Sequence, residues 1–281
     1  MWRNLLAENF ENADIALFGI AVDENCSVGR GTALAPKTLR ECSEYLPPYT
    51  AAGEKLEPKL WDLGDVTEFD YGQVFEKMAS GKDKKCTFMI GGDHSVSILS
   101  EKAFRALHSG KIGLIHIDAH ADICDVYMDS KNSHACVNRR ALENGYAATD
   151  LSLIGIRSFE GQEVEYLADN PVLVARADEV VQKGADKVVD ELCQKYAGYD
   201  GIYLSFDIDA VDPAYAPGTG TPEPFGLSNL TVLAILKGLV ERLPVKAFDV
   251  VEVSPPLDVN NITTWLALKY ILEIIKIIEN K

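Results

Sequence analysis

Short runs of apolar residues alternate along this chain with longer segments in which apolar residues recur at helical spacing. The short runs are rich in Val, Ile, Leu and Phe and lack the polar alternation of a strand with one face in water, so they predict parallel strands covered on both faces. Strands are predicted at residues 14–22, 60–65, 86–90, 112–118, 151–156, 172–175, 201–208 and 246–253. Helices are predicted at residues 36–45, 71–79, 96–108, 135–144, 178–196, 228–242 and 262–279.

This alternation of eight strands with helices predicts an α/β protein with a parallel sheet and right-handed crossovers. The pattern does not separate a closed barrel from an open three-layer sandwich, but both build ligand sites at the carboxyl ends of the strands. The Pro- and Gly-rich segment 213–226 follows a strand that ends in aspartates, so it is interpreted as an active-site loop rather than a linker. We therefore expect one domain over residues 1–281.

Composition narrows the classes of partner and compartment. The net charge of −16 argues against nucleic acid, because phosphate binding needs clustered Lys and Arg, and it favours a small cationic ligand. The six cysteines are scattered without a Cys-x-x-Cys pair, which is typical of reduced thiols in the cytosol. The longest apolar run, Ala13 to Val22, is shorter than the ~20 residues that cross a bilayer. We expect a cytoplasmic protein with no membrane attachment.

One polar motif stands where the predicted strand 112–118 ends. Asp118, His120 and Asp122 occupy alternate positions, so in an extended segment their side chains share a face. Two carboxylates and an imidazole backed by apolar residues would repel and desolvate one another without a cation, which indicates a metal site. The alternative is an ordinary polar strand exit, with carboxylates that are solvated or cap the next helix.

Two further motifs follow other strands. In segment 91–95, Gly-Gly-Asp-His-Ser, the glycines allow a tight turn that directs His94 across the top of the sheet, although a histidine at a turn is often structural. In segment 205–213, Asp207 and Asp209 share a face directly after an apolar run. Two buried carboxylates side by side need metal or protons to neutralise them, so a protonated acid pair is the competing interpretation of this motif alone.

Taken together, the three motifs supply two imidazoles and four carboxylates. This hard, oxygen-rich set suits two Mn²⁺ ions better than zinc or copper, provided that some carboxylates bridge. Two such ions can lower the pKa of a water molecule and so provide a nucleophile near neutral pH. The predicted metal ligands are His94, Asp118, His120, Asp122, Asp207 and Asp209.

The three motifs, complete and in this order, resemble the signatures of the ureohydrolases, the arginase and agmatinase family, and further similarity extends from about Gly29 to the final helix. The resemblance implies an αβα sandwich on an eight-stranded, mainly parallel sheet, a binuclear manganese centre, hydrolysis of a guanidinium to an amine and urea, and a homo-oligomer, either a trimer or a hexamer. It also implies the distribution of the ligands. His94, Asp118, Asp122 and Asp207 would bind one metal, and Asp118, His120, Asp207 and Asp209 the other.

The resemblance gives two further residues catalytic and substrate-binding roles. His134 matches the family histidine that shuttles protons to the leaving amine; by itself it would be interpreted as a surface histidine at a helix start. Glu252 ends a strand as the family's guanidinium-binding carboxylate does, and a planar guanidinium can donate two parallel hydrogen bonds to it. The alternative for Glu252 is a strand-end carboxylate paired with a lysine.

Substrate choice depends on weaker signals. Arginases carry Asn at the position of Cys124, and a thiol is a poor substitute for that polar contact. Segments 218–224 and 133–135 resemble the agmatinase branch, and the acidic balance fits agmatine, so we expect agmatine to yield putrescine and urea. Guanidinobutyrase, formiminoglutamase, arginase and a noncatalytic binding member of the family are the alternatives. Glu160 and Glu163 are expected in a loop from which the family recognises the far end of its substrate.

Overall fold

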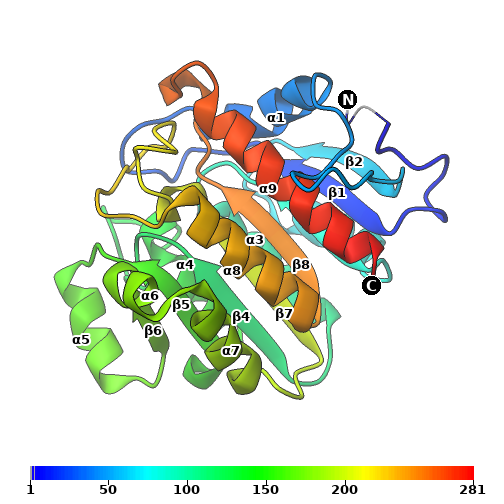
Figure 1. The fold of residues 1–281 in the computed structure, drawn as a ribbon. Coiled ribbons are helices and arrows are strands. Elements are labelled where there is room, and N and C mark those ends of the chain that lie inside the picture. Colours follow the sequence, from blue (N-terminus) through cyan, green and yellow to red (C-terminus); the bar gives the residue numbers. More distant parts are fainter. Residues whose placement is uncertain (1, 3) are drawn as a thin grey trace.

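All eight strands lie in one parallel sheet in the order β2-β1-β3-β8-β7-β4-β5-β6, and helices cover both faces (Figure 1). The computed structural model describes residues 2 and 4–281. The sandwich implied by the family resemblance is confirmed, and the closed barrel that the pattern left open is wrong. The strands are β1 Ile15–Ile20, β2 Leu60–Val66, β3 Cys86–Ile90, β4 Ile112–Ile117, β5 Leu151–Ile156, β6 Leu173–Arg176, β7 Gly201–Asp207 and β8 Val245–Val251.

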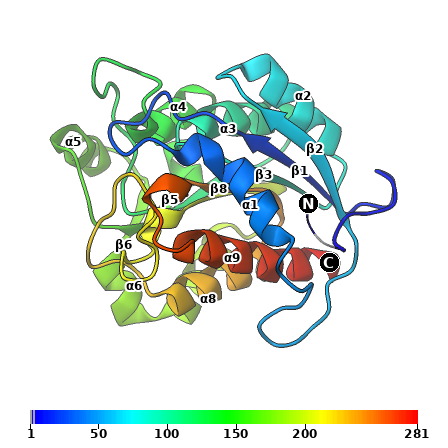
Figure 2. The same cartoon turned by 90° about the horizontal axis from the view of Figure 1, so that it is seen from above.

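The helices pack on the sheet through two clusters of buried apolar side chains, one on each face of the sheet. Figure 2 shows α2, α3 and α4 on one side of the sheet and α8 and α9 on the other. Strands β1, β3, β4, β5 and β7 are buried along their whole length, as their continuous apolar runs predict. The helices are α1 Ala35–Ser43, α2 Tyr71–Gly81, α3 Val96–Leu107, α4 Val137–Glu143, α5 Gly161–Asp169, α6 Ala177–Lys183, α7 Ala185–Lys195, α8 Asn229–Arg242 and α9 Ile262–Glu279.

Two helix predictions are wrong in detail. The single helix expected at 178–196 is two helices, because Gly184 between them adopts a φ of 83° that interrupts the helical backbone. Helix α5 was not predicted at all, so Glu163 lies in its first turn rather than in a loop. The Glu163 carboxylate accepts a hydrogen bond from the backbone N–H of Glu160 and so stabilises the start of the helix.

Strand order brings the polar motifs together. The four central strands β3, β8, β7 and β4 are neighbours in the sheet although they are far apart in the sequence. His94, Glu252, Asp207 and Asp118 stand at or just beyond their carboxyl ends. The motifs therefore meet at one edge of the sheet, where parallel strands place their ligand sites. Among the described residues, no helix combines the length and the apolar character needed to span a membrane.

Candidate active site

Three carboxylates, those of Asp118, Asp122 and Asp207, surround one ring nitrogen of His94, and we call this group the carboxylate fan. Nδ1 of His94 lies 3.0 Å from Asp118 Oδ2, 3.0 Å from Asp122 Oδ2 and 3.2 Å from Asp207 Oδ2. One ring nitrogen has at most one proton to donate, so it cannot satisfy three carboxylates. His94 Nδ1 and Asp118 Oδ2 are both buried without a properly oriented hydrogen-bond partner among the described residues. This arrangement fits ligands that converge on a metal ion.

The hydrogen bonds behind His94 determine which nitrogen can bind a metal. Nε2 lies 3.0 Å from the hydroxyl of Ser205, and that hydroxyl donates to Asp249 Oδ1 at 2.7 Å. Ser205 can therefore accept the Nε2 proton, which would leave the Nδ1 lone pair available for a metal ion among the three carboxylates. Asp249 is held in turn by the hydroxyls of Tyr203, at 2.6 Å, and Ser97, at 2.8 Å.

A second group adjoins the first and shares Asp118 with it. His120 Nδ1 lies 3.0 Å from Asp209 Oδ2 and 3.6 Å from Asp118 Oδ1. Asp118 thus presents Oδ2 to His94 and Oδ1 to His120, as a bridging carboxylate would. Asp207 Oδ1 accepts a hydrogen bond from the backbone N–H of Asp209 at 2.8 Å, which fixes the two aspartates relative to each other.

The electrostatics of the two groups are those of crowded, buried carboxylates. Burial and the nearby charges of Asp209 and Asp118 raise the pKa of Asp207 well above its usual value. Burial opposes ionisation of Asp118 as well, but its contacts with His120 and His94 outweigh that effect and lower its pKa. Divalent cations at this position would neutralise these charges without protons.

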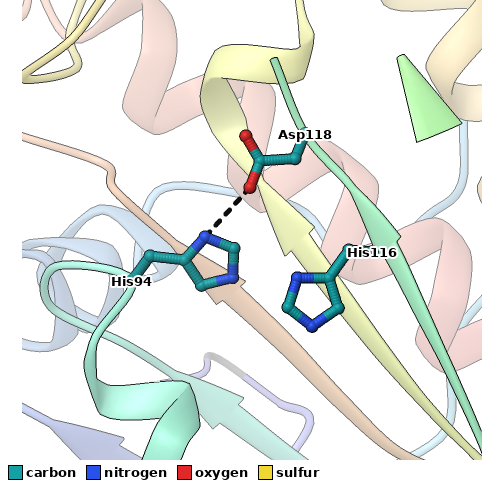
Figure 3. Close-up of side chains that lie close together, drawn as sticks. All are labelled: His94, His116 and Asp118. Carbon is teal, nitrogen blue, oxygen red and sulfur yellow. Dashed lines mark ion pairs between the residues drawn. The ribbon is translucent and has the colours of Figure 1, made fainter. Parts of the chain in front are cut away.

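His116 is a neighbour of the site that the sequence did not single out. Its ring stacks on that of His94 with centroids 5.0 Å apart, and Figure 3 shows the two rings beside Asp118. Both ring nitrogens are engaged elsewhere: Nε2 lies 2.6 Å from Glu101 Oε1 and Nδ1 lies 3.3 Å from Asn138 Nδ2. Burial lowers the pKa of His116 to about 4, so its ring is neutral. His116 therefore supports His94 from below rather than facing the carboxylate fan.

His134 and Glu252 form a second pair beside the fan. Nδ1 of His134 lies 3.1 Å from Glu252 Oε1, which also accepts the backbone N–H of His94 at 2.8 Å. The other ring nitrogen, Nε2, lies 2.9 Å from the Ser27 hydroxyl, a contact without any signal in the sequence. Both residues are buried, so the interpretations of His134 as a surface residue and of Glu252 as a partner of lysine are wrong.

Charge and backbone conformation both mark this pair. Burial disfavours the charged form of His134, but the hydrogen bond and the charge of Glu252 outweigh it and raise the pKa of His134 to about 9. Glu252 has a φ of 62° and Asp122 a φ of 46°. Both values lie in the left-handed region of backbone conformation, which residues other than glycine rarely adopt. Such strain concentrates at functional sites because the surrounding structure must hold it in place.

A cavity of about 400 Å³ opens above these residues. His120, His134 and Glu252 lie in its lining, together with residues 220–223 of the segment predicted as an active-site loop. Among residues 2 and 4–281, no Lys or Arg lines it. Cys124 is fully buried and does not line the cavity, so it cannot contact a ligand there. The carboxylates in the cavity lining are those of Asp122, Glu160, Glu163, Asp207, Asp209, Glu223 and Glu252.

Comparisons with known proteins agree with this site. A model of the arginase family matches residues 13–276. Guanidinobutyrase of Pseudomonas aeruginosa is 32% identical over 93% of this chain and 85% of its own. Mitochondrial guanidino acid hydrolase of Homo sapiens is 34% identical over 94% of this chain and 78% of its own. The crystal structure of agmatine ureohydrolase from Thermoplasma volcanium has a TM-score of 0.86 at 32% identity, over 99% of this chain and 94% of its own. The chain therefore belongs to the arginase family, the metal-dependent ureohydrolases that hydrolyse guanidino C–N bonds.

Proposed function

We propose that this ureohydrolase acts on agmatine and releases putrescine and urea. The observation that carries the proposal is that no Lys or Arg lines the cavity within the described part of the chain, whereas Glu160 and Glu223 supply carboxylates outside the proposed metal ligands. Agmatine has a cation at each end, whereas arginine, guanidinobutyrate and formiminoglutamate each carry a carboxylate. That carboxylate would meet repulsion and no cationic partner in this lining.

The proposed metal content is two Mn²⁺ ions. The oxygen-rich donor set and the orphaned buried atoms of His94 and Asp118 support it. When bound, the ions would supply Lewis acidity and a water molecule of lowered pKa. The proposed ligands are His94, Asp118, Asp122 and Asp207 for one ion, and Asp118, His120, Asp207 and Asp209 for the other.

Glu252 is proposed to bind and orient the guanidinium. Its Oε1 is held by His94 N–H and by His134, and no hydrogen bond from the described residues engages Oε2. Oε2 can therefore accept a guanidinium N–H, and a carboxylate held by two donors loses little freedom on binding. This contact would place the guanidinium carbon over the carboxylate fan.

His134 is proposed to hold the proton that the departing amine needs. With a pKa raised to about 9, its ring is protonated at neutral pH. Glu252 orients the ring through Nδ1, and the ring lies in the cavity lining, within reach of a substrate that Glu252 binds. The amine leaves with the proton and the ring is reprotonated from solvent.

A product assay tests the proposal. The Mn²⁺-loaded protein is incubated with agmatine, arginine, guanidinobutyrate and formiminoglutamate, and urea and formamide are measured. We expect the highest kcat/KM for agmatine. Guanidinobutyrate is the second candidate, because relatives named guanidinobutyrase and guanidino acid hydrolase are as similar as those named agmatinase. Preference for any carboxylate-bearing substrate would contradict the proposal, and no product at all would favour a noncatalytic member.

Manganese, assembly and location have separate tests. Chelation should abolish activity, and Mn²⁺ should restore it at two ions per chain in a metal titration.

We also propose a homo-oligomer, a trimer or a hexamer, which light scattering would detect in solution. A cytoplasmic location stays a prediction, and imaging of the tagged full chain would check it.

A further inference from the structure

The carboxylates of the cavity differ in whether the protein already engages their oxygens. Glu163 Oε1 accepts the backbone N–H of Ile123 at 2.9 Å, and its Oε2 accepts that of Glu160 at 2.8 Å. Glu252 holds His134, as described above. Three others belong to the carboxylate groups around the histidines, namely Asp122, Asp207 and Asp209.

Two carboxylates remain, and their surroundings differ. Glu160 is exposed at the start of α5, where water screens its charge. The side chain of Glu223 is 35% exposed. Its Oε1 accepts a hydrogen bond from the Ser158 hydroxyl at 3.1 Å and lies 3.7 Å from His120 Nε2. No hydrogen bond from the described residues engages Glu223 Oε2, so this oxygen can accept one from a ligand in the cavity.

The main chain beneath Glu223 is clamped. The Arg157 guanidinium donates through Nη2 to the carbonyls of Glu223 and Asp209, both at 2.7 Å, and through Nε to that of Pro224 at 3.0 Å. Prolines on both sides of Glu223 restrict its backbone further. One half-buried side chain, that of Arg157, thus fixes Glu223 relative to Asp209 at the floor of the cavity. A carboxylate held in this way loses little entropy when it binds.

We propose that Glu223 binds the cationic far end of the substrate and so determines the preference for guanidines that end in an ammonium group. The inference rests on the proposed function, because the guanidinium would bind at Glu252, which lines the same cavity. An ammonium can donate a charge-assisted hydrogen bond to Glu223 Oε2. A neutral end gains nothing there, and a carboxylate is repelled.

The kinetic test compares two substrates that differ only at the far end. In Glu223→Gln, kcat/KM for agmatine should fall about tenfold, mainly through KM, because a charge-assisted hydrogen bond is lost. For butylguanidine, which lacks the ammonium, kcat/KM should change less than about twofold. Equal losses for both substrates would overturn the proposal, because they would indicate a structural defect.

Glu165→Gln is the control, since it removes the same charge from an exposed position of α5 that does not line the cavity. We expect it to change kcat/KM for agmatine by less than about twofold. A loss as large as that of Glu223→Gln would overturn the proposal in favour of a diffuse effect of charge. Circular dichroism of both variants would confirm that they fold.

Calorimetry separates this inference from the proposed function. Putrescine carries an ammonium at each end and does not react, so its Kd for the Mn²⁺-loaded protein should rise about tenfold in Glu223→Gln. If wild-type protein binds putrescine through Glu223 but releases no urea from agmatine, the proposed function fails and the role of Glu223 stands. If agmatine is hydrolysed and Glu223→Gln binds putrescine like wild type, the role of Glu223 fails alone.

Discussion

The floor and the wall of the cavity are built differently. The floor comprises the residues at the ends of β4 and β7 together with His94 and Glu252, and its carboxylates are almost fully buried and held by backbone and side-chain contacts. The wall consists of loops, where Met128 and Phe159 are exposed. We therefore expect changes in the floor to impair the reaction, and changes in the wall to alter which molecules fit. The following predictions test that division, from the largest expected effect to the smallest.

Removal of a floor carboxylate should abolish both metal binding and activity. In Asp209→Asn, we expect kcat to fall by about a thousandfold, because several kcal/mol of transition-state stabilisation would depend on the proposed metal ions. Metal content, measured by inductively coupled plasma mass spectrometry, should fall with it. Full manganese content in this variant would contradict the assignment of Asp209 as a ligand.

His134 contacts the floor residue Glu252 but should act on protons rather than on metals. His134→Ala should lower kcat by about a hundredfold, the usual contribution of a general acid, while manganese content stays at the wild-type level. Steady-state kinetics and metal analysis on the same preparation would check both parts. Loss of manganese in this variant would rule out the proton-transfer role.

The pH dependence of the wild-type enzyme should report His134. Because the pKa is raised to about 9, the proton needed by the leaving amine is present below pH 9 and is lost as pH rises through that value. The kcat should therefore fall about tenfold per pH unit above pH 9. His134→Ala should lack this limb. The same limb in the variant would assign it to another group.

A strained residue of the loop that carries Glu223, just outside the cavity lining, should tolerate replacement. Phe225 has a φ of 65° and is 89% exposed, so its side chain buries little and its backbone favours glycine. Phe225→Gly should raise the free energy of unfolding by about 1 kcal/mol without changing kcat. Denaturant unfolding would measure the gain. A large loss of activity would mean that the wall and the floor are not independent at this position.

Much of the fold could be predicted from the sequence because burial on both faces leaves a plain signal. The eight apolar runs identify eight strands, and the strand ends identify His94, Asp118 and Asp207 as neighbours before their order in the sheet is known. The fold class and the family are confirmed. The ligand assignments stay predictions, although the structure brings all six residues together.

Other features depend on long-range contacts that leave no local pattern. Ser27 meets His134 across 107 positions of sequence, and Arg157 reaches the carbonyl of Glu223 across 66. Helix α5 was missed because its apolar residues are few and its start depends on Glu163, whose role as a cap resembles that of any loop carboxylate. The part of the cavity proposed to bind the far end of the substrate is therefore the part that sequence patterns describe least.

The hydrogen bonds by which the Arg157 guanidinium holds the main chain around Glu223 bear on how the substrate preference of the enzyme can be changed. Its hydrogen bonds from Nη2 and Nε go to main-chain carbonyls, so they do not depend on which side chain stands at position 223. A mutational library confined to that position would sample new specificities while the loop stays anchored to the reaction centre. If Glu223 has the proposed role, a single substitution at this position would change substrate preference while the hydrogen bonds of Arg157 to the main chain persist.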